Sequence, residues 1–166
     1  SNVTNMSYMF SSGEMTELDL SHFNTSNVTN MTGMFQGCSS LQTIYVSNNW
    51  STDSLEDGNG QYMFSNDGNL VGGSGTTYDE NHTDEEYARP DEGVDNPGYL
   101  TLVTFYNVTY PNSSTRSYKD GTVINLGEND SPAIIETAGT ITFKYHDDKT
   151  EDTTLTKITT KTPNGF

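Results

Sequence analysis

Residues 1–25, SNVTNMSYMFSSGEMTELDLSHFNT, are repeated almost at once in residues 26–52, SNVTNMTGMFQGCSSLQTIYVSNNWST. The Met-Phe pairs of these copies, Met9–Phe10 and Met34–Phe35, lie 25 residues apart. A third pair, Met63–Phe64, follows 29 residues later in a decayed copy. A repeat of this length cannot bury its apolar side alone, so neighbouring copies must stack. The spacing therefore predicts a solenoid, an architecture that mostly binds or spans.

Each copy changes its hydrophobic period partway along. In the second copy Val28, Met31 and Met34 fall at helical spacing, and then Ile44 and Val46 alternate with polar residues. This pattern predicts a short helix or helical turn, a tight turn and a short strand in each unit. We expect the large apolar residues to form one buried stack: Met9, Phe10, Leu18, Leu20, Met34, Phe35, Ile44, Val46 and Phe64.

The remaining chain divides by composition. Residues 1–70 hold two full copies and one degenerate copy, and residues 71–100 form an acidic stretch in which Tyr78, Tyr87 and Tyr99 are interleaved. We interpret this stretch as an ordered capping loop or linker. Residues 101–166 are rich in β-forming residues separated by turn signals, with one short helix expected at 131–138. They predict a small β domain, truncated within a hairpin.

The charge excludes two classes of partner. The net charge is −16, and residues 1–88 contain 12 acidic residues and neither Lys nor Arg. Such a field repels nucleic acid and anionic lipid. The single cysteine rules out an intramolecular disulfide, and there is neither a signal peptide nor a membrane-length apolar run. Because the sequence starts inside a repeat motif, we expect it to come from a longer protein.

No catalytic constellation stands out. Cys38 and His22 could form a thiol pair, but the turn around Cys38 favours a small buried residue instead. The three histidines lack metal-ligand spacing. Calcium in the acid-rich loops, and a cross-link from Lys144 or Lys157 to Asn164, stay open alternatives, with solvated loops and edge lysines favoured. We predict no enzymatic activity, no cofactor and no metal site.

The repeated text also resembles a known family. NVTNMxxMF followed by TELDLSHFNTSNVTNM is similar to the BspA-type leucine-rich repeat of bacterial surface proteins over residues 1–100. Residues 102–166 resemble the internalin-type B-repeat, whose GW-like motif would correspond to Asn164–Phe166. The resemblance implies an α+β fold: a short leucine-rich-repeat solenoid end with a capping loop, then a small, mostly β, β-grasp-like domain.

The resemblance carries a functional expectation as well. It implies a non-enzymatic fragment of a bacterial cell-surface protein, secreted or attached to the wall, with adhesin-like recognition. The expected partners are host extracellular proteins or glycans, or other bacterial surface molecules, without membrane insertion. The alternatives are a structural stalk within a larger surface protein and an accessory module of a carbohydrate-active enzyme.

Strand alternation supplies candidate ligand-binding residues. If Leu18, Leu20, Ile44 and Val46 point inward, their polar neighbours point outward on one ladder. These neighbours are Glu17, Asp19, Ser21, Thr43, Tyr45 and Ser47. An aromatic ring among acids and hydroxyls suits a basic protein segment or a sugar, with Tyr45 as the anchor.

Overall fold

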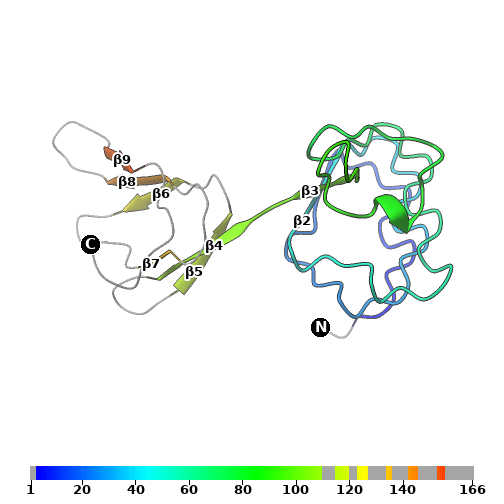
Figure 1. The fold of residues 1–166 in the computed structure, drawn as a ribbon, viewed down its shortest axis with the longest axis horizontal. Helices are drawn as coiled ribbons and strands as arrows, with labels where there is room; N and C mark the ends of the chain where they lie inside the picture. Colours follow the sequence, from blue (N-terminus) through cyan, green and yellow to red (C-terminus); the bar gives the residue numbers. More distant parts are fainter. Residues whose placement is uncertain are drawn as a thin grey trace. The chain divides into compact units, whose positions relative to one another are not determined.

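The computed structural model describes residues 3–109, 115–119, 123–126, 134–135, 142–145 and 153–155. The chain divides into two compact units, Ser1–Val103 and Thr104–Phe166. The elements of the first unit are β1 (Glu17–Asp19), β2 (Thr43–Val46), the 3₁₀ helix η1 (Glu85–Tyr87) and β3 (Leu100–Leu102). Figure 1 shows this unit as successive loops, coloured from blue to green, with few regular elements.

The first unit contains a parallel sheet in the order β1-β2-β3. Leu18 is paired with Ile44, and Ile44 with Leu100, so one apolar row crosses all three strands. Ile44 and Leu100 are fully buried. The β-branched and aromatic residues of β2, TIYV, suit this central position because such side chains pack well on a pleated surface.

The predicted α-helical part of the repeat is wrong: none of the described residues lies in an α-helix. The helical spacing instead falls in a run of turns, where Tyr8, Gly33 and Tyr62 occupy matching places with φ of 54°, 57° and 60°. A left-handed residue in each copy interrupts the right-handed helix that the spacing predicted.

The backbone N–H groups of these turns have a second reason not to form a helix. Alternate N–H groups donate to carbonyl groups of the following copy, while those between them, such as Met9 to Met6 (3.3 Å) and Met34 to Met31 (3.1 Å), donate three residues back within their own copy. From the first copy to the second, the bonds are Met6 to Asn30 (2.8 Å), Tyr8 to Thr32 (2.9 Å), Phe10 to Met34 (2.9 Å) and Ser12 to Gln36 (2.8 Å). From the second to the third, they are Met31 to Asn59, Gly33 to Gln61, Phe35 to Met63 and Gly37 to Ser65. The turns of neighbouring copies are therefore joined by a ladder of one polarity.

The predicted leucine-rich-repeat solenoid end is also wrong. The third strand of the sheet comes from Leu100–Leu102, which begins at the last residue of the acidic stretch, and not from the third copy. In the third copy, Gly72 and Gly73 stand where strand residues would be needed, and glycine weakens a strand interior. The third copy therefore supplies no strand at this place, and the strand that pairs with β2 comes from residues later in the chain.

The core is a column of aromatic rings. Phe10 and Phe35 stack with centroids 6.0 Å apart, Phe35 and Phe64 at 5.5 Å, and Tyr99 meets Phe64 edge-on at 5.1 Å. Six residues of the predicted stack are confirmed as buried: Leu20, Met34, Phe35, Ile44, Val46 and Phe64. Phe10 and Leu18 are half-buried, and Met9 is wrong because it is 45% exposed. The difference reflects position, since the first copy has a neighbour on one side only among the described residues.

The described strands of the second unit fall into two sheets. Their elements are β4 (Phe105–Thr109), β5 (Thr115–Lys119), β6 (Val123–Leu126), β7 (Ile134–Ile135), β8 (Thr142–Tyr145) and β9 (Thr153–Leu155). One sheet has the order β5-β4-β7, and the other has β6-β8-β9. The predicted short helix at 131–138 is wrong at β7, where Ile134–Ile135 pairs with β4 because two β-branched residues favour a strand. The β-grasp-like arrangement is not seen among the described strands, and the residues of the predictions for Lys157 and Asn164–Phe166 lie outside the described part of the chain.

Gly33 is a sensitive point of the turn ladder. Its φ is +57°, and a Cβ there would meet the ring of Tyr8. We expect Gly33→Ala to lower the free energy of unfolding by roughly 1–2 kcal/mol, because alanine is strained in the left-handed region and the ring must move. Gly68→Ala is the control, since a Cβ there has open space. Denaturation followed by Trp50 fluorescence checks this, and equal midpoints for the two variants would contradict it.

Candidate functional site

The candidate surface is the outward face of the three-stranded sheet. Register pairs Glu17 with Thr43, and Asp19 with Tyr45, which in turn pairs with Thr101. Glu17 and Asp19 are exposed, and Thr43, Tyr45 and Thr101 are half-buried. Four of the six predicted residues therefore share one face, which we call the strand face. Thr101 was missed because β3 comes from outside the repeat.

Ser21 and Ser47 do not belong to the strand face. Both are buried, with exposed fractions of 3% and 7%. β1 ends at Asp19 and β2 at Val46, so the alternation that predicted their direction has already stopped. The N–H of Ser21 donates to Oδ1 of Asp19 at 2.9 Å, which turns the chain inward. These two side chains help to close the turn after each strand.

The chemistry of the strand face is acidic, hydroxylic and aromatic. Glu17 and Asp19 offer carboxylates, Thr43 and Thr101 offer hydroxyl groups, and Tyr45 offers a ring with a polar tip. Carboxylates accept hydrogen bonds and attract cations, while a tyrosine gives contact area at little entropic cost. Backbone pairing fixes the spacing of all five residues.

Cys38 and Asp67 form a buried polar contact between the second and third copies. The N–H of Cys38 donates to Oδ1 of Asp67 at 2.8 Å, and the thiol of Cys38 donates to the carbonyl of Phe10 at 3.0 Å. Burial raises the pKa of the Cys38 thiol, so it stays protonated and a poor nucleophile.

Asp67 is fully buried and only half satisfied. Its Oδ2 is buried, and no donor from the described residues reaches it. Burial raises the pKa of Asp67 to about 7, although hydrogen bonds from the N–H groups of Cys38 and Gly37 act in the opposite direction. The sequence offers a weak signal for this residue, because Asp67 takes the place that Cys38 fills in the second copy.

Asp91 anchors the acidic stretch where it rejoins the sheet. Its carboxylate accepts four hydrogen bonds: from the N–H groups of Ser74 (2.8 Å), Thr76 (2.9 Å) and Gly93 (3.0 Å), and from the hydroxyl of Thr76 (2.7 Å). Burial alone would raise the pKa of Asp91, and these four donors outweigh it and lower the pKa to about 2. The carboxylate is therefore ionised and holds the loop at 72–76.

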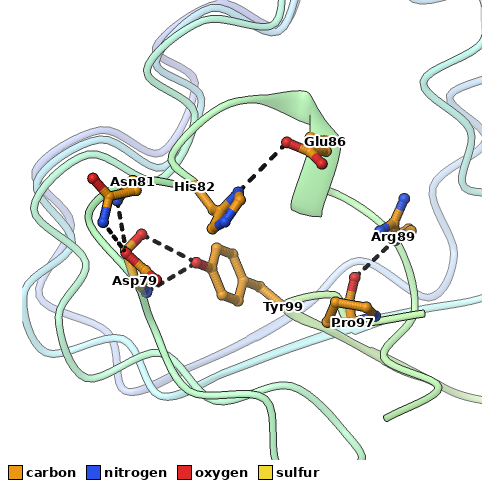
Figure 2. Close-up of polar contacts among 7 residues, drawn as sticks. All are labelled: Asp79, Asn81, His82, Glu86, Arg89, Pro97 and Tyr99. Carbon is orange, nitrogen blue, oxygen red and sulfur yellow. Dashed lines mark hydrogen bonds and ion pairs between the residues drawn. The ribbon is translucent and has the colours of Figure 1, made fainter. Parts of the chain in front are cut away.

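A second cluster lies in the acidic stretch and is shown in Figure 2. The Tyr99 hydroxyl accepts a hydrogen bond from the N–H of Asp79 at 3.0 Å and lies 3.3 Å from its carbonyl. Burial raises the pKa of Tyr99 to about 12, so this hydroxyl is neutral. His82 lies over the ring of Tyr87, and its Nδ1 is 3.5 Å from the Glu86 carboxylate. These contacts order the stretch from within.

Within the described part of the chain, no three side chains of His, Cys, Asp or Glu gather in a way that could hold a metal ion. The same residues include no helix with the length and apolarity needed to cross a membrane.

The comparisons with known proteins concern the repeat half. Residues 1–74 match a family model described as Mycoplasma protein of unknown function, DUF285. This is a bacterial repeat family associated with surface proteins. No curated protein matches the chain, and no solved structure does either. The bacterial, repetitive character expected from the sequence is confirmed for this region, whereas the finer leucine-rich-repeat assignment is not.

Proposed function

We propose that the chain is a non-enzymatic recognition module of a bacterial surface protein, located outside the cell. One observation carries this proposal: the strand face is held in register by continuous backbone pairing from β1 through β2 to β3. A rigid polar ladder with a central aromatic ring is suited to binding another macromolecule. The resemblance of the repeated sequence to BspA-type surface proteins supports an adhesin-like role.

The partner is a host extracellular protein or glycan, or another bacterial surface molecule. Glu17 and Asp19 on the strand face favour a basic protein segment or a neutral sugar over an anion. A basic segment would pair with the carboxylates and lay an apolar or aromatic group on Tyr45. A sugar would lie on the ring of Tyr45, and its hydroxyl groups would donate hydrogen bonds to the carboxylates of Glu17 and Asp19.

Binding to candidate matrix proteins tests this proposal. We expect Tyr45→Ala and Asp19→Lys each to weaken binding at least about tenfold, because central aromatic and charged contacts dominate interface energies. Asp19→Lys should also change the dependence on salt, since it reverses a charge. Glu56→Lys is the matched control, being an exposed acid outside the strands.

The outcome separates this function from the structural alternative. If both strand-face variants stay folded and bind as wild type does, the strand face is not the binding site. The two compact units within one chain would then favour a spacer that carries a binding head located elsewhere in the protein.

A further inference from the structure

Two tyrosines lie in an exposed row across the turns of the repeat. Tyr8, Gly33 and Tyr62 each come directly before the Met-Phe pair of their copy, and all three have a left-handed φ. The turn ladder holds them in order. The N–H of Tyr8 donates to the carbonyl of Thr32, and the N–H of Gly33 donates to the carbonyl of Gln61, both at 2.9 Å. Tyr8 is 52% exposed and Tyr62 is 53% exposed. We call these two side chains, with Gly33 between them, the tyrosine row.

Contacts within the described residues place both members of the row. A Cβ at Gly33 would collide with Cε1 and Cδ1 of Tyr8, so the ring of Tyr8 covers the glycine. This ring is therefore directed at the second copy, and its place does not depend on what precedes the first. The backbone at Tyr62 is held from the other side, where its N–H donates to Oδ1 of Asp84 at 2.9 Å.

The conformation of the two tyrosines costs free energy that burial does not offset. Tyrosine is uncommon in the left-handed region, where glycine or asparagine would turn the chain with less strain. A half-exposed ring gains only part of the free energy of a buried one. Residues held in such strained conformations cluster at ligand-binding sites. Strain and exposure together therefore point to a role for these rings at the surface.

The spacing of the row favours an extended sugar chain. Paired backbones lie about 4.8 Å apart, so equivalent residues two copies apart are separated by about 10 Å. Alternate sugars of an extended, β-linked hexose chain have a similar spacing and turn the same face to one side. A tyrosine ring packs against the apolar face of a sugar, and its hydroxyl group can bond to a sugar hydroxyl.

The charge of the repeats selects a neutral chain. Residues 1–88 hold 12 acidic residues and neither Lys nor Arg, so a sulfated or sialylated glycan would be repelled. The groups beside the row are hydroxyl, amide and carboxylate groups, all of which can form hydrogen bonds with sugar hydroxyls. They belong to Ser7 and Thr32, which are half-buried, and to Gln61 and Asp84, which are exposed.

We propose that the tyrosine row binds an extended, β-linked chain of neutral hexoses. One sugar lies on the ring of Tyr8, and the next but one lies on the ring of Tyr62. A basic peptide is the competing occupant, and its affinity would fall as salt rises, whereas that of a neutral chain would not. The tyrosine row shares no residue with the strand face and does not depend on it.

Calorimetric titration of the whole chain with three sugars tests the proposal. Cellohexaose and chitohexaose are extended β-linked chains, without and with acetamido groups. Maltohexaose, a coiled chain of the same glucose units as cellohexaose, is the control. We expect at least one extended chain to bind more tightly than maltohexaose by about tenfold or more, with an affinity independent of salt. Absence of binding, or equal affinity for all three sugars, would overturn the proposal.

Variants of the row identify the site. We expect Tyr8→Leu and Tyr62→Leu each to weaken binding of the extended chain about tenfold, because leucine keeps an apolar side chain but offers no ring. Tyr45→Ala is the control and should bind as wild type does, so failure of the strand-face proposal would be seen separately. Denaturation followed by Trp50 fluorescence checks that each variant is folded. Unchanged affinity in a folded Tyr8→Leu/Tyr62→Leu variant would rule out the row.

A measurement on the unaltered chain provides a check that does not depend on folding of the variants. The extended sugar should shift the ring-proton resonances of Tyr8 and Tyr62 and leave those of Tyr45 unchanged. Shifts confined to other side chains would place the sugar elsewhere and overturn the proposal.

Discussion

Asp91→Ala is expected to lower the free energy of unfolding of the first unit by about 3–5 kcal/mol. The substitution leaves four donors from Ser74, Thr76 and Gly93 without their acceptor. Hydrogen bonds to a charged group contribute roughly 1.5–3 kcal/mol each, and part of this loss is recovered as loop donors reach water. Chemical denaturation followed by the fluorescence of Trp50, the single tryptophan, measures it.

The pH dependence gives this prediction an independent check. Because the folded pKa of Asp91 lies at about 2, below the value of 3.8 for a free aspartate, its contribution is fully present above pH 4. The contribution is lost as pH falls toward 2, so the difference between wild type and Asp91→Ala should shrink there. Asp95→Ala is the matched control, since Asp95 is exposed in the same stretch. A similar loss in both variants would show that Asp91 is not a specific anchor.

Asp67→Asn is expected to stabilise the first unit above about pH 7 and to flatten its pH profile. The folded pKa of Asp67 is about 7 against 3.8 for the free group, so between these values the folded state holds a proton that the unfolded state releases. The free energy of unfolding therefore falls as pH rises from 4 to 7, by a total on the order of 4 kcal/mol. Asparagine keeps an oxygen for the Cys38 N–H and carries no charge, although its Nδ2 still lacks an acceptor.

We expect a net gain of roughly 1–3 kcal/mol for Asp67→Asn at about pH 8, and little change at about pH 4. Unfolding curves at several pH values, again read by Trp50, measure it. Glu14→Gln is the control because it removes an exposed carboxylate from another copy. Parallel pH profiles for Asp67→Asn and wild type would mean that Asp67 titrates normally in the folded protein.

Local sequence patterns predicted the strands of the repeats well. The change to alternation located β1 and β2, and the alternation correctly placed Glu17, Asp19, Thr43 and Tyr45 on one face. The same rule failed for Ser21, two residues beyond the end of β1, and for Ser47, one residue beyond the end of β2. Side chains alternate between the two faces only while the strand remains paired with its neighbour. The sequence pattern does not show where that pairing stops.

Periodicity was misleading in the turns. Val28, Met31 and Met34 have helical spacing, and all three are buried, yet no helix forms there. A ladder between copies can bury the same positions as a helix would, because residues in the left-handed region turn the chain at regular intervals. Gly33 was a possible signal for this conformation, but Tyr8 and Tyr62 were not, since tyrosine seldom adopts it.

The sequence by itself predicted β1 and β2, six of the nine large residues expected in the core, and four of the six strand residues expected to face outward. These properties follow from local period and burial. Only the tertiary structure decided that Leu100–Leu102 supplies the third strand, that Asp67 and Asp91 are buried with opposite pKa shifts, and that the turn ladder runs one way. Those features depend on contacts between segments far apart in the chain, such as Asp91 with Thr76 and Asp67 with Cys38, and no local pattern encodes such pairings.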